Sequence, residues 1–436
     1  MAPDRWIRNP RTGPDAGMDA AGPGTSGVPT AEQMVHGLRQ TAHGEGLVEL
    51  LTPEGELTPD PDYPLDVTPD LLKGLYRDMM LVRRFDREGN ALQRQGQLGI
   101  WVPLLGQEAA QIGAGRAMRP QDMAFPSYRE HGIAWCRGVD PTELLGIFRG
   151  TDHSSWNPKE KGFHDYTIVI GNQALNATGY AMGQRFDGKV GSSGPDALET
   201  DEATIVFFGD GATSQGDVHE GMVYAASFDA PVVFYCQNNQ WAISEPVETQ
   251  SRVPLHKRAA GYGFPGIRVD GNDVLACLAV TRWALDECRS GNGPVMIEAF
   301  TYRMDAHTTS DDPTRYRLAD ETEAWKMFDP IERVRVLLTR SGWADDAFFA
   351  SVQADADELA ARFRAFTVAM ETPPPTRMFS HVFSAPNQQL ERQQADYLEY
   401  LAGFADGAGG AADGAAHGDD AVRADAHAVS AAGGAR

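Results

Sequence analysis

The stretch that most constrains the fold of this chain is 204–244, which reads as a strand, a turn, a helix and a second strand. An apolar, β-branched run at 204–208 leads into a glycine–aspartate–glycine turn at 209–211, and a helical pattern follows. A second apolar run at 231–236 ends at an asparagine pair, 238–239. Two strands joined by a helix in one sheet predict a parallel pair with a right-handed crossover.

Polar groups follow both of these predicted strands. Asp210 and Asn239 come directly after the two apolar runs, at the strand ends where sheets of this kind bind their ligands. Carboxylate and amide oxygens suit magnesium and not zinc or copper, and magnesium is usually held by one or two protein groups together with phosphate oxygens. Gly209 and Gly211 let a phosphate approach the backbone, and the following helix points its N-terminus to the same place. The stretch therefore predicts a site for magnesium and a diphosphate.

Simpler explanations exist for each half of the pattern. Asp-Gly and Asn-Asn are both ordinary turn sequences. A dinucleotide-binding G-x-G-x-x-G fails because Ser214 stands where the third glycine belongs, and a P-loop lacks its Gly-Lys-Ser/Thr. Together, however, GDG and an NN pair separated by residues 212–237 form the thiamine diphosphate signature. In these residues the chain resembles the thiamine-diphosphate enzymes.

Composition excludes some classes of protein. The net charge is −23, which argues against a nucleic-acid-binding surface because such a surface is basic. No apolar run reaches the length of about eighteen residues that a membrane span needs. The four cysteines show no C-x-x-C pairing, as expected of free thiols in a reducing compartment. The N-terminal residues match neither a signal peptide nor a transit peptide, and we expect a cytoplasmic, bacterial protein.

The order of elements predicts an α/β fold with a doubly wound, mostly parallel sheet. Residues 1–45 are expected to be a disordered extension, 46–400 a single domain, and 405–436 a disordered Ala/Gly/Asp tail. Further elements expected from periodicity are a helix from Thr68 capped by Asp70, a small-residue helix in 103–117, a strand leading into a helix within 166–186, a strand at 265–270, a helix at 274–289, a strand at 294–303 and helical residues over 320–371.

Two other polar segments are candidates for the site. Arg129, next to Tyr128 in a predicted loop, offers the bidentate fork that binds phosphate, although chemistry alone favours an ordinary surface arginine beside a packed tyrosine. His307 follows the strand at 294–303 and could exchange a proton near neutral pH. A lone loop histidine is more often structural, so position alone leaves both readings open.

Residues 45–400 as a whole resemble the alpha subunit of the decarboxylating component of 2-oxoacid dehydrogenase complexes, of the pyruvate and branched-chain types. The stretches that carry this resemblance occur in the family's order: RRFDREGNALQRQGQLG, LLGQEAAQIG, FPSYREHG, IVIGNQALNATGYAMG, the GDG and NN pair, PGIRVDG and HTTSDDPTRYR. The 46–400 domain is accordingly expected to have the thiamine-diphosphate-binding fold.

The resemblance implies a role for each matching residue. It implies that Asp210, Asn239 and the carbonyl of Trp241 bind magnesium. It implies that the diphosphate is contacted by Tyr128 and Arg129 and lined by Gly211, Ala212 and Gln237. It makes Ile170 a backbone support of the thiamine ring and His307 the cofactor-contacting histidine that assists acylation of lipoyl groups. Thr308 stands where mammalian relatives carry a phosphorylated serine. Gln173 matches a potassium ligand of branched-chain relatives, but Gly171 and Asn172 do not match, so potassium is not expected.

The resemblance also implies the reaction and the partners. We expect oxidative decarboxylation of pyruvate and transfer of the acyl group to a lipoyl-bearing transacylase core. The alternatives are a branched-chain 2-oxoacid dehydrogenase alpha subunit and, more remotely, a non-catalytic scaffold subunit. The cofactor needs a second domain for its activation, and this chain has strand signals for one sheet only. A beta subunit in a heterotetramer of two alpha and two beta chains is therefore expected to complete the site.

Overall fold

The computed structural model describes residues 30, 33, 35–37, 39–40, 46–193 and 196–405. The chain divides into two compact units, Met1–Ala369 and Met370–Arg436. The second contains helix α16 (Gln388–Ala405) and a 3-10 turn at Pro375–Phe379. The disorder predicted for 1–45 and 405–436 falls almost entirely outside the described residues. The 46–400 domain boundaries stay a prediction.

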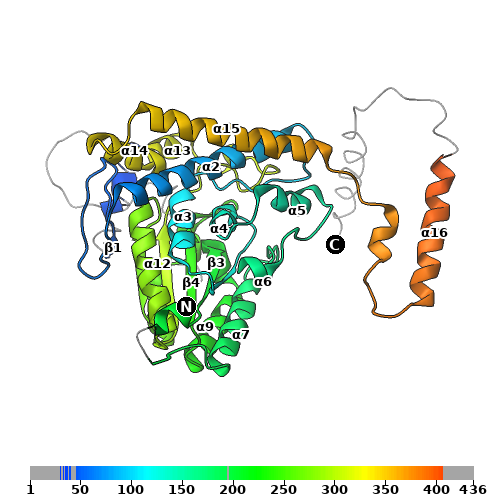
Figure 1. The fold of residues 1–436 in the computed structure, drawn as a ribbon, viewed down its shortest axis with the longest axis horizontal. Coiled ribbons are helices and arrows are strands. Elements are labelled where there is room, and N and C mark those ends of the chain that lie inside the picture. The colour runs from blue at the N-terminus through cyan, green and yellow to red at the C-terminus, as the bar shows by residue number, and fades with distance from the viewer. Residues whose placement is uncertain are drawn as a thin grey trace, which may run out of the picture. The chain divides into compact units, whose positions relative to one another are not determined.

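The first unit is built on one parallel sheet of six strands in the order β1-β7-β8-β4-β3-β2. Figure 1 labels three of them, β1, β3 and β4. All five neighbouring pairs run parallel. The predicted α/β fold with a mostly parallel sheet is confirmed. The strands are β1 (Leu47–Val48), β2 (Met123–Phe125), β3 (Thr204–Gly209), β4 (Val232–Asn238), β7 (Gly266–Asp270) and β8 (Val295–Phe300), while β5 (Trp241–Ala242) and β6 (Glu245–Pro246) pair separately.

Helices cover both faces of the sheet because alternate strand residues point to opposite sides. On one face, Tyr235 of β4 donates its hydroxyl to the Ala110 carbonyl of α3 (Glu108–Ala117). Helix α12 (Val274–Arg289) packs against α3 so closely that a Cβ on Gly113 would lie 2.5 Å from the Cys277 Cβ. On the other face, Phe208 and Phe234 form one core with α7 (Asn172–Phe186) and α9 (Gly216–Ser227).

The register of the central strands brings their polar ends to one edge. Thr204 pairs with Val232 and Gly209 with Gln237, so β3 and β4 run side by side to the same level. Asn238 in turn pairs with Phe300 at the end of β8. The residues that follow these strands therefore emerge together, as expected from the sequence.

The helices outside the sheet follow the predicted pattern with two differences. Helix α2 (Pro69–Arg94) is capped by Thr68, whose hydroxyl accepts from the Leu71 N–H at 3.2 Å. The predicted cap, Asp70, is wrong: this residue lies inside the first turn, because Pro69 is already helical. The helical region predicted over 320–371 consists of α13 (Ala319–Trp325), α14 (Pro330–Arg340) and α15 (Asp346–Ala369). The short helices are α4 (His131–Cys136), α5 (Leu145–Arg149), α6 (Pro158–Lys161), α8 (Ala197–Thr200), α10 (Val247–Gln250) and α11 (Arg258–Tyr262).

The strand predicted ahead of α7 is wrong. The apolar residues Ile168 and Val169 are 57% and 68% exposed and belong to no strand. The sequence predicted a strand here from its apolar run. An isolated bridge joins Ala124 of β2 to Phe163, which precedes that run. Exposed apolar side chains continue onto the adjoining helices and form what we call the α7–α9 apolar face: Tyr180, Phe186, Val223, Tyr224 and Phe228. Within the described part of the chain, no helix is long and apolar enough to cross a membrane.

Candidate functional site

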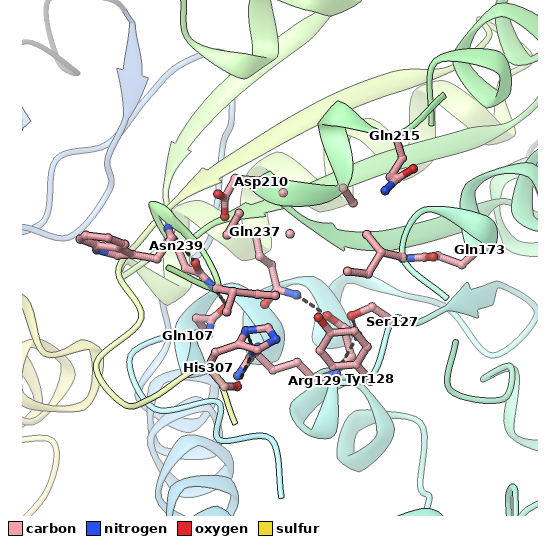
Figure 2. A pocket seen from close by; sticks show the side chains of 18 residues that line it. Gln107, Ser127, Tyr128, Arg129, Gln173, Asp210, Gln215, Gln237, Asn239 and His307 are labelled. Atoms are coloured by element: carbon pink, nitrogen blue, oxygen red, sulfur yellow. Dashed lines mark hydrogen bonds between the residues drawn. The ribbon is translucent and has the colours of Figure 1, made fainter. Parts of the chain in front are cut away.

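A cavity of about 160 Å³ opens at the carboxyl edge of the central strands (Figure 2). Its wall comes from the turn after β3, the loop after β4, the loop before α4 and the loop after β8. All ten residues that the sequence singled out line this one cavity, although their individual roles stay predictions. They are Tyr128, Arg129, Ile170, Asp210, Gly211, Ala212, Gln237, Asn239, Trp241 and His307.

Asp210 places a buried carboxylate in the cavity wall. Its side chain is 1% exposed, and burial raises the pKa of its carboxyl to about 6. The Nε2 amide of Gln250 donates to Oδ2 at 3.1 Å. A neutral amide compensates a buried negative charge only in part, so the site favours a cation beside this carboxylate.

The loop after β4 presents two further oxygens. Asn239 accepts from the Trp241 N–H through Oδ1 at 3.2 Å, and its Nδ2 donates to Gln107 Oε1 at 3.3 Å. The Trp241 carbonyl accepts from a guanidinium nitrogen of Arg303 at 3.0 Å. Both oxygens retain a lone pair, so each can still bind a metal ion.

The same loop has an unusual backbone. Gln240 and Ile243 adopt φ angles of 69° and 55°, in the left-handed region that non-glycine residues rarely enter. The first asparagine of the pair anchors this geometry: Asn238 donates to the buried Glu298 at 2.8 Å and accepts from the Gln240 N–H at 3.1 Å. Strained backbone of this kind concentrates at functional sites.

Arg129 and His307 form the opposite wall. The Arg129 guanidinium donates to the Pro103 carbonyl, to the His307 carbonyl at 3.0 Å and to His307 Nδ1 at 3.1 Å. Burial, Arg129 and Arg303 together lower the pKa of His307 to about 3. Burial also lowers the pKa of Arg129. The Tyr128 ring meets the imidazole edge-on, with centroids 6.1 Å apart.

A buried polar network holds Gln237 in the cavity floor. Its Nε2 donates to Glu130 at 2.7 Å, and its Oε1 accepts from Gln111 at 3.1 Å. Glu130 also accepts from the Ser127 hydroxyl at 2.8 Å. Burial raises the pKa of Glu130. The network fixes the loop that carries Tyr128 and Arg129 relative to strand β4.

The cavity suits magnesium and a diphosphate on structural grounds. One carboxylate, one amide and one carbonyl are all hard oxygen donors. Two buried amide atoms in the wall have no hydrogen-bond partner among the described residues, Gln107 Nε2 and Gln173 Oε1. A Cβ on Gly211 would lie 2.8 Å from the Ala242 Cβ, so only glycine fits this close approach of turn and loop. The described residues contain no group of three or more His, Cys, Asp or Glu side chains that could hold a metal ion.

Sequence reasoning missed several residues of this wall. Gln107, Ser127 and Glu130 stand inside the motif stretches but were given no role. The available signal was a polar residue inside an otherwise small and apolar segment. Arg303, at the end of the predicted strand 294–303, was also given no role, yet its guanidinium donates to the Trp241 and Ile243 carbonyls.

Comparisons with known proteins agree on one family. The family model described as "Dehydrogenase E1 component" matches residues 76–374. The chain is 42% identical over 350 residues to the 3-methyl-2-oxobutanoate dehydrogenase subunit alpha of Mycobacterium tuberculosis, covering 80% of this chain and 92% of that protein. It is 37% identical over 339 residues to the pyruvate dehydrogenase E1 component subunit alpha of Acholeplasma laidlawii, covering 76% and 94%. It is 32% identical over 363 residues to the mitochondrial 2-oxoisovalerate dehydrogenase subunit alpha 1 of Arabidopsis thaliana, covering 81% and 74%.

Proposed function

The chain belongs to the dehydrogenase E1 component family, and from this premise we propose that it is the alpha subunit of a thiamine-diphosphate-dependent 2-oxoacid dehydrogenase acting on pyruvate. The E1 family is one of dehydrogenases and implies thiamine diphosphate. The single observation that carries the proposal is that Asp210, Asn239, Arg129 and His307 line one cavity. An acid and an amide oxygen face an arginine and a histidine there, as binding a magnesium diphosphate requires.

In this proposal Asp210, Asn239 and the Trp241 carbonyl hold magnesium. Magnesium prefers about six oxygens, so diphosphate and water oxygens would complete the shell. Tyr128 and Arg129 lie near the diphosphate, while Gly211, Ala212, Gln237 and Ile170 shape the space around the cofactor. Bound thiamine diphosphate supplies the electron sink for the loss of carbon dioxide.

His307 acts as a neutral hydrogen-bond donor in this proposal. Because arginine can only donate, Nδ1 of His307 must accept, and the proton of the neutral ring sits on Nε2. The low pKa of His307 keeps the imidazole uncharged at neutral pH. Nε2–H is then available for the oxygen or sulfur of an incoming group during lipoyl acylation.

A second candidate substrate is 3-methyl-2-oxobutanoate. The relative from Mycobacterium tuberculosis, which is named for that substrate, is 42% identical, whereas the relatives named for pyruvate reach 37% and 36%. Pyruvate stays our primary prediction, and the branched-chain acid is the alternative to test beside it.

The proposed partners are a beta subunit, in a heterotetramer of two alpha and two beta chains, and a lipoyl-bearing transacylase core. The names of the relatives support this because they describe alpha subunits and E1 components. A cytoplasmic location stays a prediction.

The test is a reconstituted assay. The chain is co-expressed with a beta subunit and supplied with thiamine diphosphate, magnesium and an artificial electron acceptor. We expect turnover with pyruvate above that with 3-methyl-2-oxobutanoate, and none from the chain alone. Full turnover by the isolated chain would refute the need for a beta subunit. A preference for the branched-chain acid would refute the assignment of pyruvate as substrate. Inactivity of the complex towards both acids would refute the proposed enzymatic function.

A further inference from the structure

Gln107 is a buried glutamine, and only one of the two polar atoms of its side-chain amide has a hydrogen-bond partner among the described residues. It is 1% exposed and lines the cavity, and its Oε1 accepts from Asn239 Nδ2 at 3.3 Å. Its Nε2 has no hydrogen-bond partner among the described residues. Native proteins satisfy nearly all buried polar groups, so each exception calls for an explanation.

Helix capping does not explain the position of the Gln107 side-chain amide. Gln107 is the N-cap residue of α3, but its side chain makes no capping hydrogen bond. Only its backbone serves the helix, since its carbonyl accepts from the Gln111 N–H at 3.2 Å. The amide is turned to the cavity instead, where it meets Asn239 (Figure 2).

Hydrogen bonds and a close backbone contact fix the position of the backbone next to Gln107. The Gly106 carbonyl accepts from the Thr301 hydroxyl at 2.8 Å, and the Gly106 N–H donates to Glu108 Oε2 at 3.0 Å. Gly106 has a φ of 96°, and a Cβ there would overlap the Tyr302 carbonyl. Arg83 in turn holds Glu108 at 2.7 Å. The unpaired N–H therefore cannot reach another partner by a shift of its backbone.

We infer that Gln107 is a further binding residue of this site: its Oε1 orients the Asn239 amide, and its Nε2–H is kept for an anionic oxygen of the bound diphosphate. The inference rests on the proposed function. A donor is the right group at this point because diphosphate oxygens only accept. The hydrogen bond to Asn239 leaves Asn239 Oδ1, rather than Nδ2, to face a cation.

The test measures binding to the cofactor-free complex of this chain with its proposed beta subunit, with no turnover involved. Gln107→Met keeps the length of the side chain and removes both amide contacts. We expect it to weaken the binding of thiamine diphosphate and of magnesium pyrophosphate by about tenfold to a hundredfold, the loss that goes with a hydrogen bond to a charged group. Isothermal calorimetry at saturating magnesium gives both dissociation constants.

A second variant separates the two contacts of the amide. Gln107→Glu retains an acceptor for Asn239 Nδ2 and loses the donor. Because a carboxylate then faces the diphosphate, we expect its affinity for pyrophosphate to fall at least as far as that of Gln107→Met. Binding like that of the unchanged protein would overturn the inference.

The matched control is Gln184→Met. Gln184 is also buried, lies outside the cavity, and is paired through Nε2 to Glu202 at 3.2 Å and through Oε1 to Thr204 at 2.8 Å. We expect this variant to melt at a lower temperature and to keep both affinities. If it lost affinity as Gln107→Met does, the effect would be general and the inference would fail. If the unchanged complex bound no thiamine diphosphate at all, the proposed function would fall and the inference with it.

Discussion

The Arg129 guanidinium holds His307 twice, through the ring Nδ1 at 3.1 Å and the backbone carbonyl at 3.0 Å. These two contacts fix both the orientation of the imidazole and the nitrogen that carries its proton. They also join the loop before α4 to the loop after β8, segments that are far apart in the sequence.

Replacing His307 by asparagine should change how stability depends on pH. The folded-state pKa of His307, about 3, lies below its ordinary value of 6.5, so its contribution is present at pH 7.5 and is lost as the pH falls through 6.5 towards 3. Between pH 7.5 and 5.5 the unchanged protein should lose about 1 kcal/mol more unfolding free energy than His307→Asn. Urea denaturation of both proteins at the two pH values measures this. Parallel losses would show that His307 titrates normally in the fold.

Replacing Asp210 by asparagine should stabilise the cofactor-free protein and prevent cofactor binding. Burial raises the pKa of Asp210 to about 6, so above that pH the fold carries a buried charge that the unfolded chain keeps hydrated. Removing it should add about 3 kcal/mol of unfolding free energy at pH 7.5 and nothing well below pH 4. Magnesium-dependent binding of thiamine diphosphate should disappear in calorimetry.

The control for Asp210 is Glu220→Gln, an exposed carboxylate on α9. It should alter neither stability nor binding. Retained cofactor affinity in Asp210→Asn would remove this residue from the proposed metal site.

Alanine at Gly106 should be strongly destabilising. Gly106 combines a φ of 96° with a Cβ position that overlaps the Tyr302 carbonyl, and we expect a loss of at least about 3 kcal/mol. Gly96 is the comparison because its φ is 72° while a Cβ there meets nothing within 4 Å. Alanine at Gly96 should cost about 1 kcal/mol. Equal losses in thermal denaturation would mean that backbone conformation, and not the overlap, dominates.

Asp270→Asn should disrupt a buried ion cluster outside the cavity. The Asp270 carboxylate accepts from Arg39 at 3.3 Å and from Arg333 at 2.9 Å. The two guanidiniums hold its pKa well below the ordinary value, so its stabilisation is present above about pH 4 and is lost as the pH falls further. In the variant the guanidiniums of Arg39 and Arg333 face a neutral amide in place of the Asp270 carboxylate. The free energy of unfolding should therefore fall by about 3–5 kcal/mol at pH 7. Glu323→Gln, in an exposed pair with Lys326, should leave the urea midpoint unchanged.

Much of the fold could be predicted because local patterns and tertiary structure agree. The strands on either side of α9 were predicted close to their observed limits, because a short apolar, β-branched run that ends at turn residues is typical of a buried strand. The run ending at Ile170 has the same local pattern but lies outside the sheet. Pairing depends on neighbours that the run itself does not contain, so periodicity alone could not decide this case.

Only those residues of the candidate site that belong to a recognisable sequence motif could be predicted. Asp210 and Asn239 stand at strand ends, and topology brings strand ends together. Gln107 shows the limit: it lies at the start of a helix far from the signature, and its half-satisfied amide becomes visible only when burial and hydrogen bonds are known. Arg303 likewise gains its importance from the Trp241 carbonyl, a backbone group that any residue would supply.

The α7–α9 apolar face has a practical consequence for whoever purifies this chain. Five large aromatic or aliphatic side chains open to water make self-association favourable, and the −23 net charge opposes it through mutual repulsion. Salt screens that repulsion and leaves the attraction between apolar surfaces intact. The isolated subunit should therefore aggregate more readily as ionic strength rises, and dilute, low-salt buffers should keep it dispersed during handling.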